Sequence, residues 1–96
     1  MQFLVIAKVG ENTPLEKVAP HIKPEAEKVW QYYVAEVVRS VYYIADMSGA
    51  VLTIEAKNLE NAQAIVAEFP MAREGVLNFE ILPLKPYTGL EALFAK

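Results

Sequence analysis

The stretch that most constrains the fold is residues 36–56, EVVRSVYYIADMSGAVLTIEA. Val, Ile, Tyr and Thr fill both halves of it, and such β-branched and aromatic residues suit a half-buried pleated surface. Between the halves, residues 46–49 (DMSG) are polar and include a glycine, as a hairpin connection requires. The stretch therefore predicts two long antiparallel strands at the centre of a sheet.

Further elements flank this hairpin on both sides. Residues 2–9 (QFLVIAKV) form a short, nearly continuous apolar run, which is typical of a central strand. Residues 59–69 predict a helix that is capped by Asn58 and ended by Pro70, and residues 71–75 predict a loop. Residues 76–84 (VLNFEILPL) predict a fourth strand. The tail, residues 85–94, is apolar enough that we expect it to dock on another surface.

A broken helix is predicted between the first strand and the hairpin. Pro20 and Pro24 each remove a backbone donor and crowd the preceding turn, so we expect the helix to stop and restart there. Beyond Pro24, apolar side chains recur every three or four positions and form one stripe. The members of this stripe are Ala26, Val29, Trp30, Tyr33 and Val37.

The resulting order, β-α-β-β-α-β, predicts an α+β fold. Two right-handed crossovers around a hairpin give a four-stranded antiparallel sheet with both helices on one face, the ferredoxin-like plait. Residues 1–96 are short enough to form this single domain. Both faces of the predicted strands carry large apolar side chains, and an exposed apolar patch marks an interface. We therefore expect a homodimer with two sheets face to face, against the alternative of a monomer with one solvated face.

Composition excludes several functional classes. No run approaches the ~18 apolar residues of a membrane span, and the first residues read as a strand and not as a basic leader, so we expect a cytoplasmic protein. The net charge of −3 without a Lys/Arg cluster argues against binding to nucleic acid. Without cysteine and with a single histidine, the chain predicts neither a disulfide nor a metal site, and no cofactor is implied.

Four stretches of the chain resemble the muconolactone isomerase-like family of dimeric α+β barrels. VRSVYYI at 38–44 is similar to that family's Trp-Arg-His-Leu-Trp-Arg-Ile strand, and residues 49–56 are similar to its next strand. Residues 59–62 and 69–71 resemble the two ends of its second helix, and residues 78–87 its last strand and tail. The YYIAD and PLKPY pieces also resemble small bacterial barrel proteins of unassigned function. The resemblance implies a dimeric barrel and a cofactor-independent reaction that moves a proton alpha to a lactone carbonyl.

Two positions depart from the family strand. Arg39 matches its first arginine, but Ser40 stands in place of its histidine and Tyr43 in place of its second arginine. These changes remove a histidine and a cation from the strand. They affect the expected activity and leave the expected fold untouched.

Three polar residues are candidates for catalysis. Arg39 has the planar fork that anchors a carboxylate, against the alternative of an ion pair with Glu55 or Glu80. His21 is a candidate because histidine is the residue type that suits proton transfer near neutrality, against the commoner role of a solvated surface histidine. Asp46 is a candidate base, against the role of a turn residue that bonds its own backbone.

Four aromatic residues are candidates for substrate binding. Trp30 and Tyr33 are expected in the core between helix and sheet, or in the wall of a pocket if one opens there. Tyr42 and Tyr43 are adjacent on a strand and point to opposite faces, so at most one is expected in any one pocket. By the same alternation, Arg39 shares a face with Tyr43.

Two classes of function follow from these residues. The first is a cofactor-independent, isomerase-like enzyme that binds a small apolar acid or lactone, with cofactor-free oxygenation of an aromatic compound as a variant. The second is a non-catalytic dimeric module that binds a hydrophobic metabolite or a protein partner. The convergence of His21, Arg39 and Asp46 on an enclosed cavity would favour the first.

Overall fold

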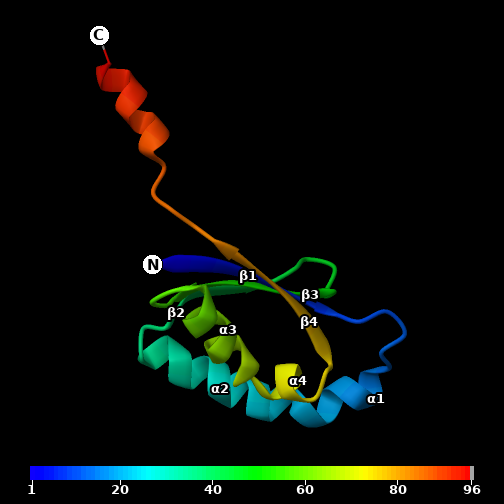
Figure 1. Ribbon diagram of the computed structural model, residues 1–96. Coiled ribbons are helices and arrows are strands. Elements are labelled where there is room, and N and C mark those ends of the chain that lie inside the picture. The colour runs from blue at the N-terminus through cyan, green and yellow to red at the C-terminus, as the bar shows by residue number, and fades with distance from the viewer. Residues whose placement is uncertain (96) are drawn as a thin grey trace.

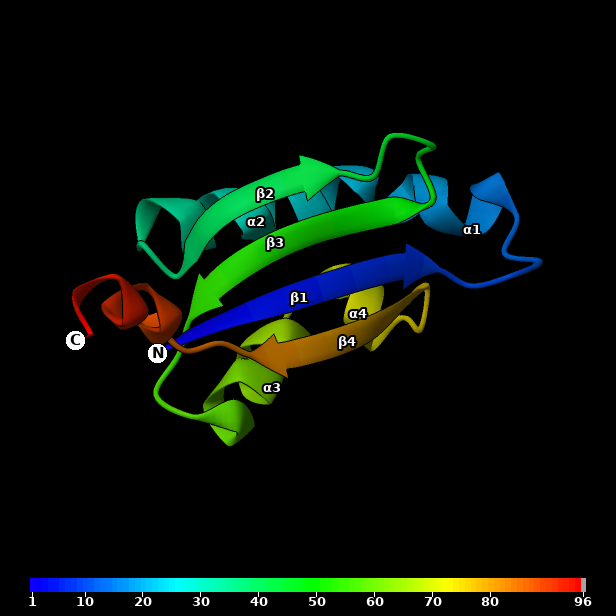
Figure 2. The same ribbon diagram turned by 90° about the horizontal axis from the view of Figure 1, so that it is seen from above.

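The computed structural model describes residues 1–95 and contains a four-stranded antiparallel sheet with the order β2-β3-β1-β4 (Figures 1 and 2). The helices α1 to α4 cover one face of this sheet and leave the other open (Figure 1). The predicted α+β, ferredoxin-like plait is confirmed. The elements are β1 (Gln2–Val9), α1 (Leu15–Val18), the 3₁₀ helix η1 (Ala19–His21), α2 (Ile22–Val34), β2 (Val38–Tyr43), β3 (Gly49–Glu55), α3 (Leu59–Ala67), α4 (Pro70–Arg73), β4 (Leu77–Pro83) and the 3₁₀ helix η2 (Thr88–Phe94).

Three local predictions need correction. The hairpin is not wholly central, because β3 is an inner strand but β2 forms one edge of the sheet. Pro20 does mark a break, within η1, whereas Pro24 is tolerated inside the first turn of α2, where the amide that proline lacks has no helical acceptor. Pro70 ends α3 and also begins α4, in a segment predicted as a loop, because proline suits the first helical position.

The core lies between the sheet and the helices. Phe3, Val5 and Ile54 are fully buried on the helix-facing side of β1 and β3, against Val66 and Phe69 of the α3 region. Each large apolar side chain buried in this way stabilises the fold by roughly 1.5–3 kcal/mol. The Phe69 ring stacks on Phe79 of β4 with centroids 6.5 Å apart, which ties α3 to the far edge of the sheet.

A bulge in β2 breaks the simple alternation of its side chains. Val38 pairs with Ile54 and Ser40 with Thr53, so Arg39 is the extra residue between two consecutive pairs. The prediction that Arg39 shares a face with Tyr43 is therefore wrong, because a bulge shifts the alternation by one residue. After the bulge, the Ser40 and Thr53 hydroxyls hydrogen-bond at 2.7 Å on the open face.

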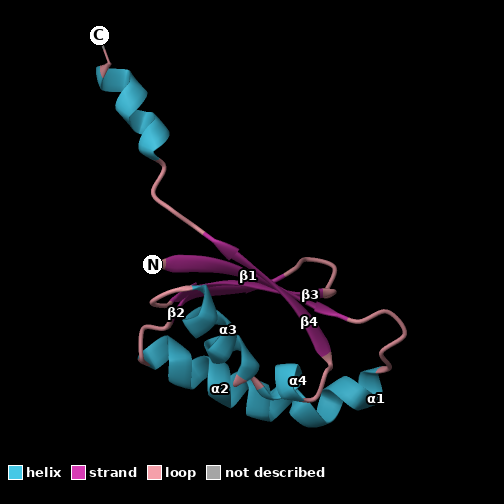
Figure 3. Ribbon diagram, in the orientation of Figure 1, coloured by secondary structure: helices cyan, strands magenta, loops and turns pink. Residues whose placement is uncertain are grey.

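The chain beyond β4 leaves the body of the protein. Residues 85–95, here called the C-terminal arm, run from β4 into η2 and point away from the helix layer (Figures 1 and 3). Every residue of this arm is exposed, including Leu90, Leu93 and Phe94. The sequence predicts that this tail docks on another surface, whereas in the structure residues 85–95 are exposed along their whole length. Within residues 1–95, no helix is long and apolar enough to cross a membrane.

Candidate functional site

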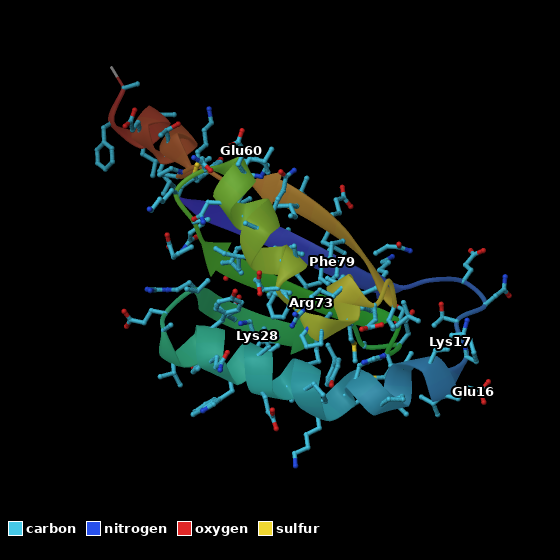
Figure 4. All side chains as sticks on the ribbon, turned by 60° about the horizontal axis from the view of Figure 1, so that its bottom comes forward. Glu16, Lys17, Lys28, Glu60, Arg73 and Phe79 are labelled. Atoms are coloured by element: carbon cyan, nitrogen blue, oxygen red, sulfur yellow. The ribbon has the colours of Figure 1, made fainter. Side chains whose placement is uncertain are left out.

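A cavity of about 890 Å³ lies between α2 and the helix-facing side of the sheet. Its floor is made by the ends of the strands, including Ala7, Leu52 and Phe79, and its walls come from α1, α2 and β2. Figure 4 views this region from the helix side, with Phe79 of β4 labelled beside α3. The volume falls in the ~300–1,000 Å³ range of small-molecule sites, and apolar lining is their usual character.

Two aromatic residues of α2 form the wall of the cavity. The rings of Trp30 and Tyr33 stack with centroids 6.0 Å apart and an interplanar angle of 17°. Trp30 is 65% exposed and Tyr33 is 51% exposed, so the expectation of core positions is wrong for this chain, and both line the cavity instead. Val29 and Tyr32 pack against the core in their place, because the apolar stripe of α2 is wider than its contact with the sheet.

Tyr42 and Tyr43 of β2 also border the cavity. Strand alternation predicts that only one of them does so. Because β2 is an edge strand, a cavity that opens along it is bordered by residues of both faces. The structure thus brings all four predicted aromatic residues to one cavity, and their role in binding a substrate stays a prediction.

Glu25 is the one charged residue in the lining of the cavity as described by residues 1–95. It lies in the first turn of α2, half-buried, and its Oε1 accepts a hydrogen bond from the Met71 amide at 2.9 Å. Burial raises the pKa of Glu25, while the Met71 amide and the nearby His21 oppose that rise. A carboxyl group with a raised pKa in an apolar cleft is a typical proton carrier.

His21 lies one helical turn before Glu25, outside the lining of the cavity. Positions four apart on a helix are neighbours, and the charge of His21 is close enough to affect the pKa of Glu25. His21 is half-buried and therefore is not a freely solvated surface residue. His21 is therefore a neighbour of Glu25, the acidic residue in the lining of the cavity.

Arg39 and Asp46 lie away from the cavity lining. Within residues 1–95 Arg39 makes no ion pair, although its charge contributes to lowering the pKa of Glu55. The larger causes of that lowered pKa are hydrogen bonds from the N-terminal amine and Gln2. Asp46 is exposed in the β2–β3 connection, where its Oδ1 accepts a hydrogen bond from the Ser48 amide at 2.9 Å. Hydrogen bonds from Ser48, led by the one involving its side chain, lower the pKa of Asp46.

The three predicted catalytic residues are thus not brought together around the cavity, and of the three only His21 lies beside its carboxyl group. Among residues 1–95, no three His, Asp or Glu residues lie close enough together to hold a metal ion. Glu25 was missed because it looks like one of several charged residues off the apolar stripe. The signal available in the sequence was its position directly after Pro24, in a restarted helix turn next to His21.

Two solved structures share this fold across nearly the whole chain. One is 5-chloro-2-hydroxyhydroquinone dehydrochlorinase from Burkholderia phenoliruptrix AC1100, in complex with 2,5-dihydroxybenzoquinone, at a TM-score of 0.76 and 15% identity. The match covers 93% of this chain and 98% of that one. The other is muconolactone isomerase, at a TM-score of 0.69 and 16% identity, covering 91% of each chain.

The TM-scores establish a shared fold, and identities this low do not assign an activity. No protein-family model matches the chain, and no curated protein sequence matches it. The chain therefore shares the fold of muconolactone isomerase, as the four stretches between residues 38 and 87 predict. Any reaction must be argued from the cavity itself.

Proposed function

We propose that this protein is a small-molecule-binding dimeric barrel enzyme that moves a proton on a small, apolar ring compound without a cofactor. The observation that carries the proposal is a half-buried carboxyl group, Glu25, which is the one charged residue in the mostly apolar and aromatic lining of a cavity of about 890 Å³, as residues 1–95 describe it. Both structural neighbours named above are enzymes with names that denote reactions of small ring compounds, which supports the proposal by analogy.

The lining favours an uncharged ligand over an anion. Aromatic walls such as Trp30 and Tyr33 offer flat contact surfaces to a ring. Arg39, the expected anchor for a carboxylate, lies outside the lining, and the one charged lining residue is itself an acid. A carboxylate ligand would therefore gain no cation in the described cavity, and of the predicted acid or lactone we favour a neutral lactone.

Glu25 would act as both base and acid in this reaction. Its carboxylate removes a proton from the carbon alpha to the carbonyl, and the electron pair delocalises into a dienolate. The carboxylic acid then returns the proton at the far end of the conjugated system, so the double bond moves and no atom is gained or lost. His21, one turn away, influences the charge state of Glu25 and does not touch the ligand.

The test uses α-angelica lactone, a neutral lactone whose double bond moves by this route. Isomerisation is followed by the ultraviolet absorbance of the conjugated product, and binding by the fluorescence of Trp30, the single tryptophan. We expect Glu25→Gln to lower kcat by about 10²–10⁴-fold, the usual range for loss of a general acid–base group. The glutamine retains an oxygen that accepts the Met71 hydrogen bond, so binding of the lactone should persist.

Glu27→Gln is the matched control, because Glu27 is an exposed carboxylate of α2 outside the cavity lining. It should leave both kcat and binding unchanged. If Glu25→Gln isomerises the lactone as fast as the wild type, Glu25 is not the proton carrier. If the wild type binds the lactone without converting it, the second function, a binding module in which Glu25 only caps α4, is the better description.

A further inference from the structure

The aromatic pair of α2, Trp30 and Tyr33, lies well along the helix from the carboxyl group of the cavity. The two residues follow Glu25 by five and eight positions. At a rise of about 1.5 Å per residue, these positions are roughly 7.5 and 12 Å farther along the axis of α2. All three side chains tilt towards the start of the helix, so the spacing along the axis is retained. A single lactone ring placed against Glu25 is too short to reach the aromatic pair.

We propose that the natural ligand of this cavity is a neutral lactone that carries a second, aromatic ring. The lactone lies at Glu25, and the aromatic ring packs against Trp30 and Tyr33, which thereby select the substrate. The identity of the reacting ring rests on the proposed function. The aromatic subsite rests on the shape and chemistry of the cavity.

The lining residues of α2 form a continuous path between the two ends of this ligand. Positions four apart on a helix are neighbours, so Glu25, Val29 and Tyr33 follow one another along one side of α2. Ala26 and Trp30 form the adjacent row by the same spacing. All five residues line the cavity. The cavity therefore runs along the helix from the carboxyl group to the aromatic pair.

Ala26 leaves room in the middle of this path. It has the shortest side chain among the residues that α2 contributes to the lining. It follows Glu25 directly and lies one helical turn before Trp30. A longer side chain at this position would occupy the space between the carboxyl group and the aromatic pair. The small residue thus favours a ligand that extends past it.

The chemistry of the path favours an apolar, flat extension of the lactone. Val29 on the helix side and Leu52 and Phe79 on the sheet side are apolar, and Glu25 is the one charged residue in the lining formed by residues 1–95. A second charged group on the ligand would lose water there without gaining a partner. The rings of Trp30 and Tyr33 are nearly parallel, with an interplanar angle of 17°, and such faces bind another aromatic ring well.

The volume and exposure of the site agree with a ligand of two rings. A cavity of about 150 Å³ holds a benzene molecule, whereas this cavity is about 890 Å³. A single-ring ligand would leave most of that space to water. Trp30 and Tyr33 are both more than half exposed, so their rings are accessible to a ligand from the cavity. A second ring placed there would bury them and exclude water from the path towards Glu25.

A matched pair of ligands tests the proposal. α-Angelica lactone is compared with its analogue that carries a 2-phenylethyl group in place of the methyl group, so the reacting atoms are the same. Calorimetric titration measures the Kd of each lactone, and the emission of Trp30, the single tryptophan, reports its surroundings. We expect the Kd of the phenylethyl compound to be about ten-fold lower or less still, because a ring is buried on the aromatic pair. This ligand, and not the methyl compound, should shift the emission of Trp30 to the blue.

Two variants show whether any preference comes from the proposed path and not from general hydrophobicity. Ala26→Leu fills the path, although it adds apolar surface, and Tyr33→Ala removes one ring of the pair. Each should lower the ratio of the two Kd values about five-fold or more. Both residues are exposed, so circular dichroism should be unchanged. Ala64→Leu is the matched control, an exposed position of α3 outside the lining, and should keep the wild-type ratio.

Equal Kd values for the two lactones in the wild type, or a ratio that both variants leave unchanged, would overturn the proposal. The same titrations in Glu25→Gln separate this result from the proposed reaction, because binding there is measured without turnover. Turnover of α-angelica lactone with equal Kd values would support the reaction and contradict the aromatic subsite. A preference for the phenylethyl compound without turnover of either lactone would support the subsite and contradict the reaction. Failure of both lactones to bind would contradict both.

Discussion

At the scale of single residues, Glu25 combines a structural and a chemical role. Its Oε1 accepts the amide hydrogen bond of Met71 and so holds α4 against α2, while the residue also lines the cavity in which we propose that it acts. A group that is both fixed by the fold and open to the cavity has the orientation that proton transfer needs. The same burial makes its ionisation unfavourable, which has a measurable consequence for stability.

Burial raises the pKa of Glu25 in the folded state above its ordinary value of 4.5. Between the unfolded and folded pKa the native state binds more protons, so the contribution of Glu25 to stability is full below about 4.5 and is lost as pH rises through the folded pKa. Relative to Glu25→Gln, the wild type should therefore lose unfolding free energy as pH rises from 4 to 7. Urea titrations of both proteins across this range, fitted at each pH, measure the difference. A difference that is flat or of opposite sign would contradict the raised pKa.

Gly49 is required by close backbone approach. A Cβ at this position would collide with the carbonyl group of Ala7 on the neighbouring strand β1. The obstacle is main chain and not a flexible side chain, so we expect Gly49→Ala to cost about 3 kcal/mol, the upper end of ordinary overpacking. Gly75→Ala is the control, because a Cβ at that position meets open space. Its expected loss of unfolding free energy is only the penalty of about 1 kcal/mol for a left-handed backbone conformation. Chemical denaturation of the two variants should rank them in that order, and equal costs would exclude the collision.

Individual site residues were harder to predict than the surface they form. The sequence predicts Trp30 and Tyr33 in the core, with the wall of a pocket as the alternative, and the structure has them exposed in the lining of the cavity. Glu25 was not singled out, since its burial depends on α4, and that helix was predicted as a loop. Asp46 and Arg39 were predicted as site residues from the chemistry of their side chains. That chemistry does not indicate where a turn or a bulge places them in the fold.

At the scale of elements, local capping explains why the second crossover helix begins where it does. Asn58 Oδ1 accepts from the Asn61 amide at 2.8 Å, and Asn61 Oδ1 accepts from the Lys57 amide at 2.9 Å. The two asparagines satisfy donors that the first turn of α3 would otherwise leave to water. This reciprocal pair fixes the start of α3 relative to β3.

Removing the cap should therefore destabilise the protein. We expect Asn58→Ala to lower the free energy of unfolding by about 1 kcal/mol, the typical value of an N-cap. Asn58→Asp, which keeps an accepting oxygen and adds a charge favoured at a helix N-terminus, should be close to wild type. Thermal unfolding monitored at 222 nm compares the three proteins. Equal losses for alanine and aspartate would show that the hydrogen bond contributes nothing.

The elements that were predictable are those whose signal is local. The apolar runs of β1 and β3 and the cap at Asn58 can each be recognised from a few consecutive residues, and the structure contains all three. The bulge at Arg39 depends on the pairing of two strands, so no pattern within β2 alone reveals it. The exposure of the C-terminal arm likewise could not be predicted from its own residues, because its apolar composition is typical of a segment that packs against the body of a protein.

At the scale of the whole molecule, the open face of the sheet is the feature from which we predict a dimer. Val51 lies at its centre, paired with Ile6 on one side and Tyr42 on the other. Leu4 and Leu82 lie in the next row of the same face, which also carries Thr53 and, beside Ile6, Glu80. No helix of residues 1–95 covers this side of the sheet (Figure 3). This partly apolar area is therefore left uncovered by the rest of residues 1–95.

This surface leads to a prediction about mass. At micromolar concentration the wild type should sediment at about twice the chain mass of 10.7 kDa. Val51→Glu should shift the protein towards the single-chain mass, because dimerisation would then bury an unpaired carboxylate next to an apolar sheet. The fold should survive, since Val51 points away from the helix-facing core.

Gln63→Glu is the matched control, because it adds the same charge at an exposed position of α3 on the opposite side of the molecule. It should leave the dimer intact. Sedimentation equilibrium of the three proteins measures the difference, and a wild type of single-chain mass would contradict the face-to-face dimer. If the dimer forms but Val51→Glu does not weaken it, the two copies associate through another surface.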